Sequence, residues 1–309
     1  MTAVRPLVAA LLSAALGCSP HVGHPPVQAE QVDAQIQDDA PAAFASLTAA
    51  YDRTLRIAER LRLANVGACA DQVAPSLGWI AMSERDFGGL EMRQLAGRFL
   101  TAGKVPVVVA VAPEGGASKA GVQIGDHVRS LGGARAGTAI QVTRAEEELA
   151  DKDAIVVERD GAELNLPVTP TRVCRTHVQP DDWPSIGVWQ KGTTVYVSLR
   201  LIELATDDQL AFAIAHGMAE QLMGVDPERT DLYVPEPEAT ALAVQLSERA
   251  GFSVADVEPL LRLQAVEEPW TVITTRNPLA NPYWAPKGDT RLGEIPRRIV
   301  ALRSVHAQR

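Results

Sequence analysis

The chain has 309 residues, 46% of them hydrophobic and 22% charged, and its formal net charge is −9 at pH 7. This composition is typical of a globular protein, and the length allows two modest domains. A nucleic-acid partner is disfavoured, because the charge is negative and no dense basic run offsets it. Composition alone leaves the function open.

Residues 1–18 (MTAVRPLVAALLSAALGC) have the layout of a secretory signal peptide: a positive charge, an apolar run and then small residues. The run is too short to span a bilayer comfortably, since a span takes about 20 residues. Its end, ALGC, resembles a bacterial lipobox, although the leucine stands one position late. The resemblance implies lipidation of Cys18 and a periplasm-facing membrane anchor in the bacterial cell envelope; Ser19 favours the outer membrane. The alternative is a plain secretory signal in which Cys18 is incidental.

Two segments of different character follow. Residues 19–42 are rich in Pro, Gln, Ala and Asp and have few large apolar groups, which predicts a flexible tether. Within residues 43–74, apolar side chains recur every three or four positions and predict an amphipathic helix ending near Gly67. The apolar positions are Phe44, Leu47, Tyr51, Leu55, Ala58 and Leu61.

Cys69 and Cys174 remain after the signal segment. An even pair of cysteines in an exported chain suggests a disulfide. The closed loop of about 105 residues would stabilise the fold by about 4–5 kcal/mol in the chain-entropy description. We favour this pairing over two buried free thiols because the cysteines bracket residues 75–172, which form a distinct module.

That module is predicted to consist of short strands separated by Gly and Pro. Residues 105–112 form a continuous apolar strand, and residues 153–169 form a hairpin. The hairpin turns at Asp160 and Gly161, a pair suited to two central residues with positive φ. A short helix is expected at 142–151, before the hairpin.

The stretch ASKAGVQIGDHV within this module resembles the S-x-A-G-x-x-x-G-D-x-[IV] pattern of bacterial PDZ domains. The matching residues are Ser118, Ala120, Gly121, Gly125, Asp126 and Val128. The resemblance implies a permuted PDZ-like fold, a partly open β-barrel, over residues 75–172. It also implies a carboxylate-binding loop at Leu77, Gly78 and Trp79.

PDZ domains bind extended peptides, often free C-termini, by adding a strand to a sheet edge. The alternative is a structural spacer whose groove is filled from within. The helix that would wall the groove is acidic at Glu146, Glu147 and Glu148, which does not favour an incoming carboxylate.

The remaining residues, 173–309, are predicted to form a mixed and mainly helical region. Residues 193–204 predict a strand running into a helix. A second helix covers 206–223, where Thr206 and Gln209 form a capping-box pair.

Two further helices are expected downstream. One covers 237–250, with Pro237 in its first turn and Gly251 after its end. The next is expected to begin at Ser253, with Asp256 in its first turn.

The helix at 206–223 contains AHGMAE, which is close to the H-E-x-x-H motif of zinc peptidases. That motif places two imidazoles on one helix face, with a general-base glutamate beside the first. A third ligand comes from a later helix. His216 matches the first imidazole, Glu220 stands at the second, and Gly217 replaces the general base, so no catalytic residue is predicted.

The order of strand, His216 helix and following helix resembles the HtpX/BepA type of gluzincin metallopeptidase, which includes exported lipoproteins with a PDZ module before the peptidase domain. The resemblance implies a zincin-like domain over 173–309 with Glu236 as third ligand, and a degenerate form of the family's closing segment at 288–302. Thr240 stands where the family has an aspartate. Pro237 disfavours helical backbone at Glu236.

These departures predict a pseudoprotease: an α+β envelope lipoprotein, without zinc or another cofactor, that binds exported or envelope polypeptides, including free C-termini, or a partner protein. One alternative is an active zinc metalloendopeptidase with an atypical metal site of His216, Glu220 and Glu236. Another is a structural lipoprotein without ligand. In the simplest interpretation, His216 and Glu220 are an ordinary pair one helical turn apart.

Overall fold

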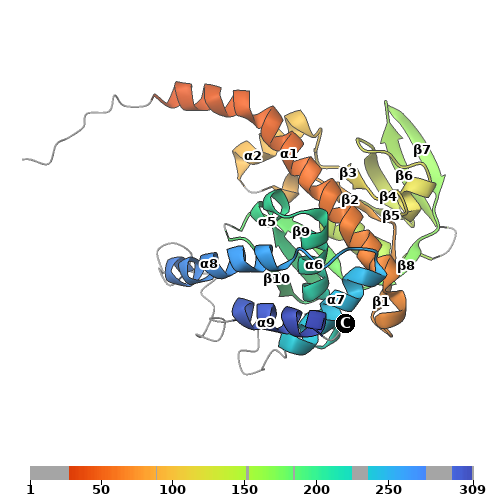
Figure 1. Ribbon diagram of the computed structural model, residues 1–309. Helices are drawn as coiled ribbons and strands as arrows, with labels where there is room; N and C mark the ends of the chain where they lie inside the picture. Colours follow the sequence, from red (N-terminus) through yellow and green to blue (C-terminus); the bar gives the residue numbers. More distant parts are fainter. Residues whose placement is uncertain are drawn as a thin grey trace, which may run out of the picture. The chain divides into compact units, whose positions relative to one another are not determined.

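The structure is a computed structural model, and it describes residues 28–87, 89–150, 153–183, 185–224, 236–275 and 294–307. The predicted signal peptide, the lipidation at Cys18 and the first part of the predicted tether lie outside these residues. The chain divides into two units, residues 1–40 and 41–309. Within the second unit the fold is α+β (Figure 1).

Helix α1 (Ala29–Ala64) includes most of the segment predicted to be a tether. Residues 29–42 are therefore helical rather than irregular. This stretch is rich in Ala and Gln, which are strong helix formers, so it needs little burial to favour a helix. The helix ends three residues before Gly67, and a short 3₁₀ turn, η1 (Val66–Ala68), follows.

The largest sheet has six strands, all paired antiparallel, in the order β2-β3-β4-β6-β7, with β5 paired to β4. The described strands form open sheets, and none of these sheets closes into a barrel. The strands of this sheet are β2 (Trp79–Met82), β3 (Val107–Val111), β4 (His127–Leu131), β5 (Ala134–Arg135), β6 (Ala154–Arg159) and β7 (Ala162–Pro167).

The hairpin of β6 and β7 turns where the sequence predicted. Asp160 and Gly161 have φ of 52° and 77°, so both central residues are left-handed, as this turn requires. The short helix expected at 142–151 is α4 (Ala139–Glu147), which begins three residues earlier. Its start is fixed by Thr138, whose side chain accepts a hydrogen bond from the Gln141 amide.

Three other short elements belong to this region and were not predicted individually. Helix α2 (Leu90–Phe99) follows a 3₁₀ turn, η2 (Glu84–Asp86), and α3 (Gly116–Lys119) lies between β3 and β4. Gly89 precedes α2 and supplies no side-chain cap, so the usual start signal of a helix is missing there.

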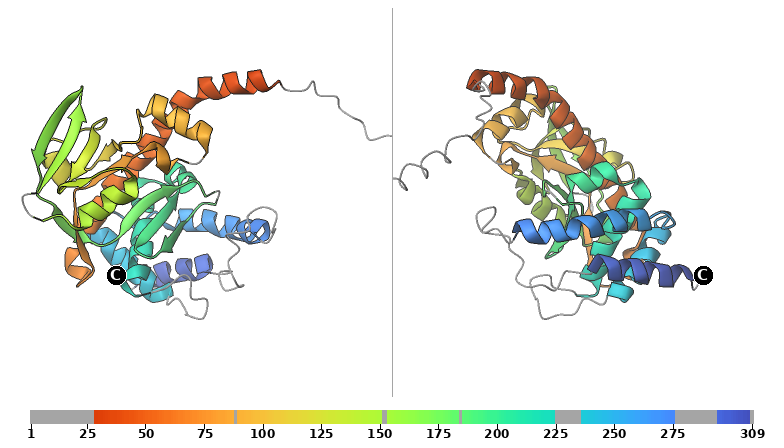
Figure 2. Two further views of the ribbon diagram at one scale, coloured as in Figure 1. Left: turned by 180° about the vertical axis from the view of Figure 1, so that it is seen from behind. Right: turned by 60° about the vertical axis from the view of Figure 1, so that its left-hand side comes forward.

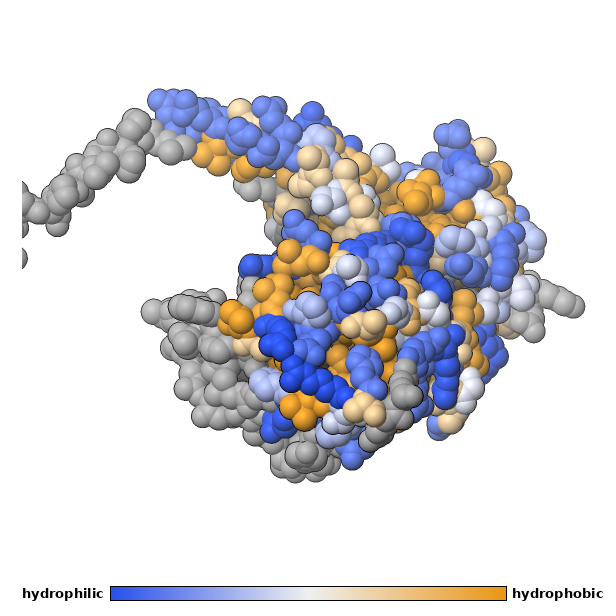
Figure 3. Space-filling model, viewed as in Figure 1, coloured by the Kyte–Doolittle hydropathy of each residue, from blue (hydrophilic) through white to orange (hydrophobic). Residues whose placement is uncertain are grey.

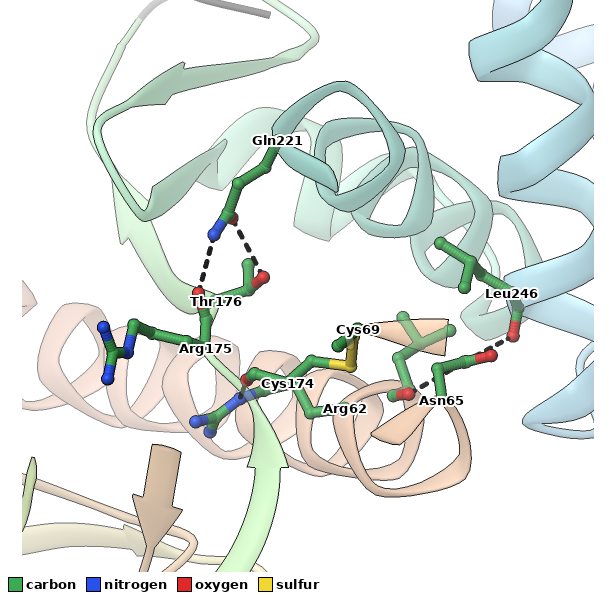
Figure 4. The surroundings of a disulfide bond; sticks show 9 residues. Arg62, Asn65, Cys69, Cys174, Arg175, Thr176, Gln221 and Leu246 are labelled. Atoms are coloured by element: carbon green, nitrogen blue, oxygen red, sulfur yellow. Dashed lines mark hydrogen bonds between the residues drawn. A yellow bond between two sulfur atoms is a disulfide. The ribbon is translucent and has the colours of Figure 1, made fainter. Parts of the chain in front are cut away.

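A two-stranded sheet joins the ends of the region: β1 (Val73–Ser76) pairs antiparallel with β8 (Thr171–Cys174). Next to it, Cys69 and Cys174 form the predicted disulfide, with Cα atoms 5.6 Å apart (Figure 4).

Polar contacts tie this disulfide to several elements. Arg62 donates to the Cys174 carbonyl, and Asn65 donates to the carbonyls of Leu61 and Leu246. The end of α1 is thereby fixed to β8 and to α7 (Glu236–Arg249), which carries Leu246.

The described residues of the C-terminal part include a three-stranded sheet and five helices. The strand β11 (Thr194–Ser198) lies between β9 (His177–Asp181) and β10 (Val188–Lys191), parallel to the first and antiparallel to the second. Helix α6 packs on this sheet, α7 packs on α6, and α9 packs on both α7 and α8 (Figures 1 and 2). The helices are α5 (Leu199–Leu204), α6 (Asp207–Leu222), α7 (Glu236–Arg249), α8 (Glu258–Thr275) and α9 (Glu294–Ala307).

The strand-to-helix prediction for 193–204 and the helix predictions around 206–223 and 237–250 are confirmed. The helix expected from Ser253 begins at Glu258 instead. Ser253 lies in the preceding turn, where its hydroxyl accepts a hydrogen bond from the Ala255 amide. A serine can cap a turn as readily as a helix, so the sequence signal was ambiguous.

The second half of α1 contributes to two hydrophobic clusters. Leu55 packs with Ala110 and Ala112, next to the six-stranded sheet. Ile57 and Leu61 belong to the larger core formed with α5, α6, α7 and β11. This helix therefore holds the C-terminal helices and the strand-rich region in one unit.

Hydrophobic and hydrophilic residues are interspersed on the surface seen in Figure 3. No helix among the described residues is both long and apolar enough to cross a membrane. A cavity of about 550 Å³ lies between α1, α2 and α5, and its lining includes Phe44, Leu47 and Met92. None of the predicted site residues lines it.

Candidate functional site

The predicted motif lies on α6, whose start is fixed by a capping box. The Thr206 hydroxyl accepts from the Gln209 amide, and the Gln209 side chain accepts from the Thr206 amide. The helix is buried along most of its length, and His216 is only 1% exposed. The imidazole is therefore held in the core, where any charge on it requires compensation.

The structure brings together the three predicted residues. His216 Nδ1 lies 3.3 Å from Glu220 Oε1, one turn further along α6. His216 Nε2 lies 3.2 Å from Glu236 Oε2, on α7. Among the described residues, neither ring nitrogen has a partner that meets hydrogen-bond geometry, so these are close polar contacts.

The expected effect of Pro237 on Glu236 is not observed. Glu236 is the first residue of α7 and Pro237 the second. Proline is tolerated in a first turn, because the missing N–H has no partner within the helix there. The Glu236 carboxylate consequently reaches the site and is 2% exposed.

A fourth residue, Arg298 of α9, completes the cluster and was not predicted. Its Nη2 lies 3.0 Å from Glu236 Oε1 and its Nε lies 3.3 Å from Glu236 Oε2, so the guanidinium forks onto one carboxylate. The same Nη2 lies 3.6 Å from Glu220 Oε1. Arg298 therefore contacts both carboxylates, and it lies inside the segment 288–302 that resembles the closing motif of the peptidase family.

The surroundings keep both carboxylates ionised. Burial alone would raise the pKa of Glu236, but His216 and Arg298 together outweigh it and lower the pKa to about 2. Burial opposes ionisation of Glu220 as well, and the same two neighbours hold its pKa below the usual value. One buried carboxylate, Glu236, and one partly buried carboxylate, Glu220, thus face one guanidinium and one imidazole.

A zinc ion requires more than the right donor types. One imidazole nitrogen and one oxygen from each carboxylate lie within 4.8 Å of one another, and all three residue types bind zinc. However, Arg298 binds both oxygens of Glu236, and the two carboxylates contact different nitrogens of the ring. A divalent ion at Nε2 would have to displace or lie beside a guanidinium. A zinc ion therefore fits this arrangement only if Arg298 moves away from Glu236.

The general-base position is closed by packing. A Cβ atom at Gly217 would lie 2.9 and 3.0 Å from the two methyl groups of Val195, on β11. A glutamate therefore does not fit there unless the strand or its side chain moves. At the family's aspartate position, the Thr240 hydroxyl is buried and has no hydrogen-bond partner among the described residues.

The second predicted site is the loop of Leu77, Gly78 and Trp79, and it holds a carboxylate of the chain itself. The Leu77 amide donates to Glu146 Oε1 at 2.6 Å, and the Trp79 indole donates to Glu146 Oε2 at 3.0 Å. Glu146 lies on α4, which contacts β2. The acidic helix thus supplies the loop with a ligand instead of only repelling one.

Comparison with known proteins adds no identification. No protein-family model matches the chain, and neither does any curated sequence.

Proposed function

We propose that the chain is a catalytically inactive, metallopeptidase-like lipoprotein of the bacterial envelope. In this proposal it is anchored through Cys18 and binds exported polypeptides or a partner protein through its PDZ-like and zincin-like parts. The observation that carries the proposal is the pair of hydrogen bonds from Arg298 to Glu236. They occupy both oxygens of the carboxylate that a gluzincin would use as a metal ligand.

Three features of the His216 cluster argue against catalysis. The general-base position is a glycine packed against Val195, and losing a general base typically lowers the rate by about 10²–10⁴. The second imidazole is replaced by Glu220, and the third ligand is bound by Arg298. Because Arg298 already contacts both carboxylates, the cluster acts as an ionic contact between α6, α7 and α9.

Three features support polypeptide binding. The order of β2, β3, α3, β4, α4 and the β6–β7 hairpin agrees with the resemblance to a permuted PDZ domain. Strand β2 lies at the end of its sheet and pairs only with β3 among the described strands, which leaves an edge suited to strand addition. The neighbouring loop is suited to a carboxylate.

Metal content and proteolysis of the purified protein test the proposal. We expect substoichiometric zinc and no cleavage of an unfolded polypeptide substrate. Arg298→Ala should increase zinc binding because it frees both oxygens of Glu236, whereas Arg297→Ala, at an exposed neighbouring position, should not.

Stoichiometric zinc in the unmodified protein, with proteolysis abolished by His216→Ala, would overturn the proposal. That outcome would favour the atypical zinc peptidase, for which the close grouping of His216, Glu220 and Glu236 is the supporting observation.

A further inference from the structure

The loop before β2 has the donor geometry of a carboxylate receptor. Two N–H groups, the Leu77 amide and the Trp79 indole, donate to different oxygens of the same carboxylate, that of Glu146. Charge-assisted hydrogen bonds of this kind are about twice as strong as neutral ones. Both N–H donors of the loop are therefore in use, and the carboxylate that they bind belongs to a side chain of α4.

The loop is held rigidly by its own carbonyl groups. The Leu77 carbonyl accepts from the Ala117 amide at 2.9 Å, and the Gly78 carbonyl accepts from the Ala112 amide at 2.7 Å. Gly78 has a φ of +65°, and a Cβ atom there would lie 2.9 Å from the Gly115 Cα, so only glycine fits. The Leu77 N–H is consequently directed at the same point whether or not Glu146 is present.

The charges behind the loop make Glu146 an unfavourable ligand. Burial raises its pKa, and Glu59 adds to this, whereas the loop hydrogen bonds and Arg62 oppose it. Arg62 is already paired with Glu59 at 2.7 Å, and one oxygen of the fully buried Glu59 has no hydrogen-bond partner among the described residues. The charge of Arg62 is therefore already offset by Glu59 and favours the ionised form of Glu146 only at a distance.

An extended peptide added antiparallel to the free edge of β2 would have its C-terminus close to this loop, because β2 begins at Trp79. Its terminal carboxylate would require the Leu77 N–H that Glu146 occupies. We propose that Glu146 is an internal ligand of this receptor, and that a polypeptide C-terminus binds there only by displacing it. This inference rests on the polypeptide-binding part of the proposed function.

The test uses a fluorescein-labelled heptapeptide that ends in valine with a free carboxylate, and the same peptide with a terminal amide. Fluorescence anisotropy compares three proteins: the unmodified full chain, Glu146→Ala and the control Glu163→Ala. Glu163 is exposed on β7, the strand at the opposite edge of the same sheet. Glu146→Ala should bind the free-carboxylate peptide about tenfold tighter or more, as expected when competing charged hydrogen bonds are removed. The amidated peptide and Glu163→Ala should show no gain. Equal affinity of Glu146→Ala and the unmodified chain for the free-carboxylate peptide overturns the inference.

A second measurement separates this inference from the proposed function. The Trp79 indole N–H signal, assigned with Trp79→Phe in ¹H–¹⁵N spectra, should shift in Glu146→Ala and stay in place in Glu163→Ala. An unmoved signal overturns the internal contact and leaves the proposed function standing. A shifted signal with equal, measurable binding of the free-carboxylate peptide by both chains overturns the displacement alone. A shifted signal with no binding of that peptide by either chain overturns the peptide-binding part of the function as well. Glu146→Gln, which keeps the side-chain size, should give an intermediate gain and serves if the alanine variant does not fold.

Discussion

Replacing Arg298 by leucine removes the guanidinium from a buried cluster and leaves both carboxylates in place. Arg298 is 8% exposed, and its fork holds both oxygens of Glu236. Leucine fills part of the same volume but donates no hydrogen bond. The variant therefore isolates the loss of charge compensation at Glu236 and Glu220 from the loss of packing.

The size of the effect follows from the Glu236 carboxylate. Lowering its pKa from 4.5 to about 2 corresponds to about 3 kcal/mol of stabilisation at pH 7, at about 1.4 kcal/mol per pKa unit. Removing one partner from a buried ion pair typically costs about 3–5 kcal/mol. Because His216 also contributes to the shift, we expect Arg298→Leu to lower the free energy of unfolding by about 3 kcal/mol, the lower end of that range.

Urea unfolding at pH 7, followed by far-UV circular dichroism, measures this difference. Arg297→Leu is the matched control, because Arg297 is exposed on the same helix and should change stability little. Combining Arg298→Leu with Glu236→Gln should restore part of the loss, since the unpaired charge is then removed. A loss below about 1 kcal/mol, the range of a surface pair, would refute the argument that this fork compensates a buried charge.

The remaining predictions concern other parts of the fold. The unmodified protein should lose stability as the pH falls from about 4.5 to about 2, because Glu236 has a lowered folded-state pKa and stabilises the fold only while ionised. In Glu236→Gln the free energy of unfolding, measured by urea unfolding at each pH, should depend less on pH over this interval. Replacing Cys69 and Cys174 together by alanine should cost about 4–5 kcal/mol in chemical unfolding, from the 105-residue separation they close. Gly217→Ala should destabilise the protein in thermal melts, since overpacking against Val195 costs about 1–3 kcal/mol and exceeds the helix-propensity gain of about 1 kcal/mol. Adding Val195→Ala to this variant should restore part of the lost stability.

Features that depend on a few neighbouring residues were predictable from the sequence. The capping box at Thr206 and Gln209 and the left-handed turn at Asp160 and Gly161 were confirmed, because each is defined within four residues. The structure begins α4 three residues before the predicted start, although Thr138 is an ordinary N-cap residue.

Features that depend on distant contacts were only partly predictable. Arg298 is 62 positions from Glu236, and no local pattern indicates that pairing. A resemblance had drawn attention to its segment without giving it a role. Glu146 is 69 positions from Leu77, and its charge was taken as hostile to a carboxylate in the groove. The negative charge of Glu146 is evident from the sequence. Its hydrogen-bond partners, the Leu77 amide and the Trp79 indole, depend on where the fold places α4.

The two candidate sites share a physical feature that sets a condition on any ligand. In each, a side chain of the protein satisfies the group that an external ligand would use: Arg298 on Glu236, and Glu146 on the Leu77 and Trp79 donors. A ligand must then exchange with an internal group, so its apparent affinity is reduced by the free energy of the internal contact. The exchange is unfavourable at Glu236, because departure of Arg298 would leave a carboxylate that is 2% exposed without its compensating charge. It is more favourable at Leu77, where the departing Glu146 is a partly buried acid that gains solvation when it leaves. Binding is therefore expected at the β2 edge rather than at His216.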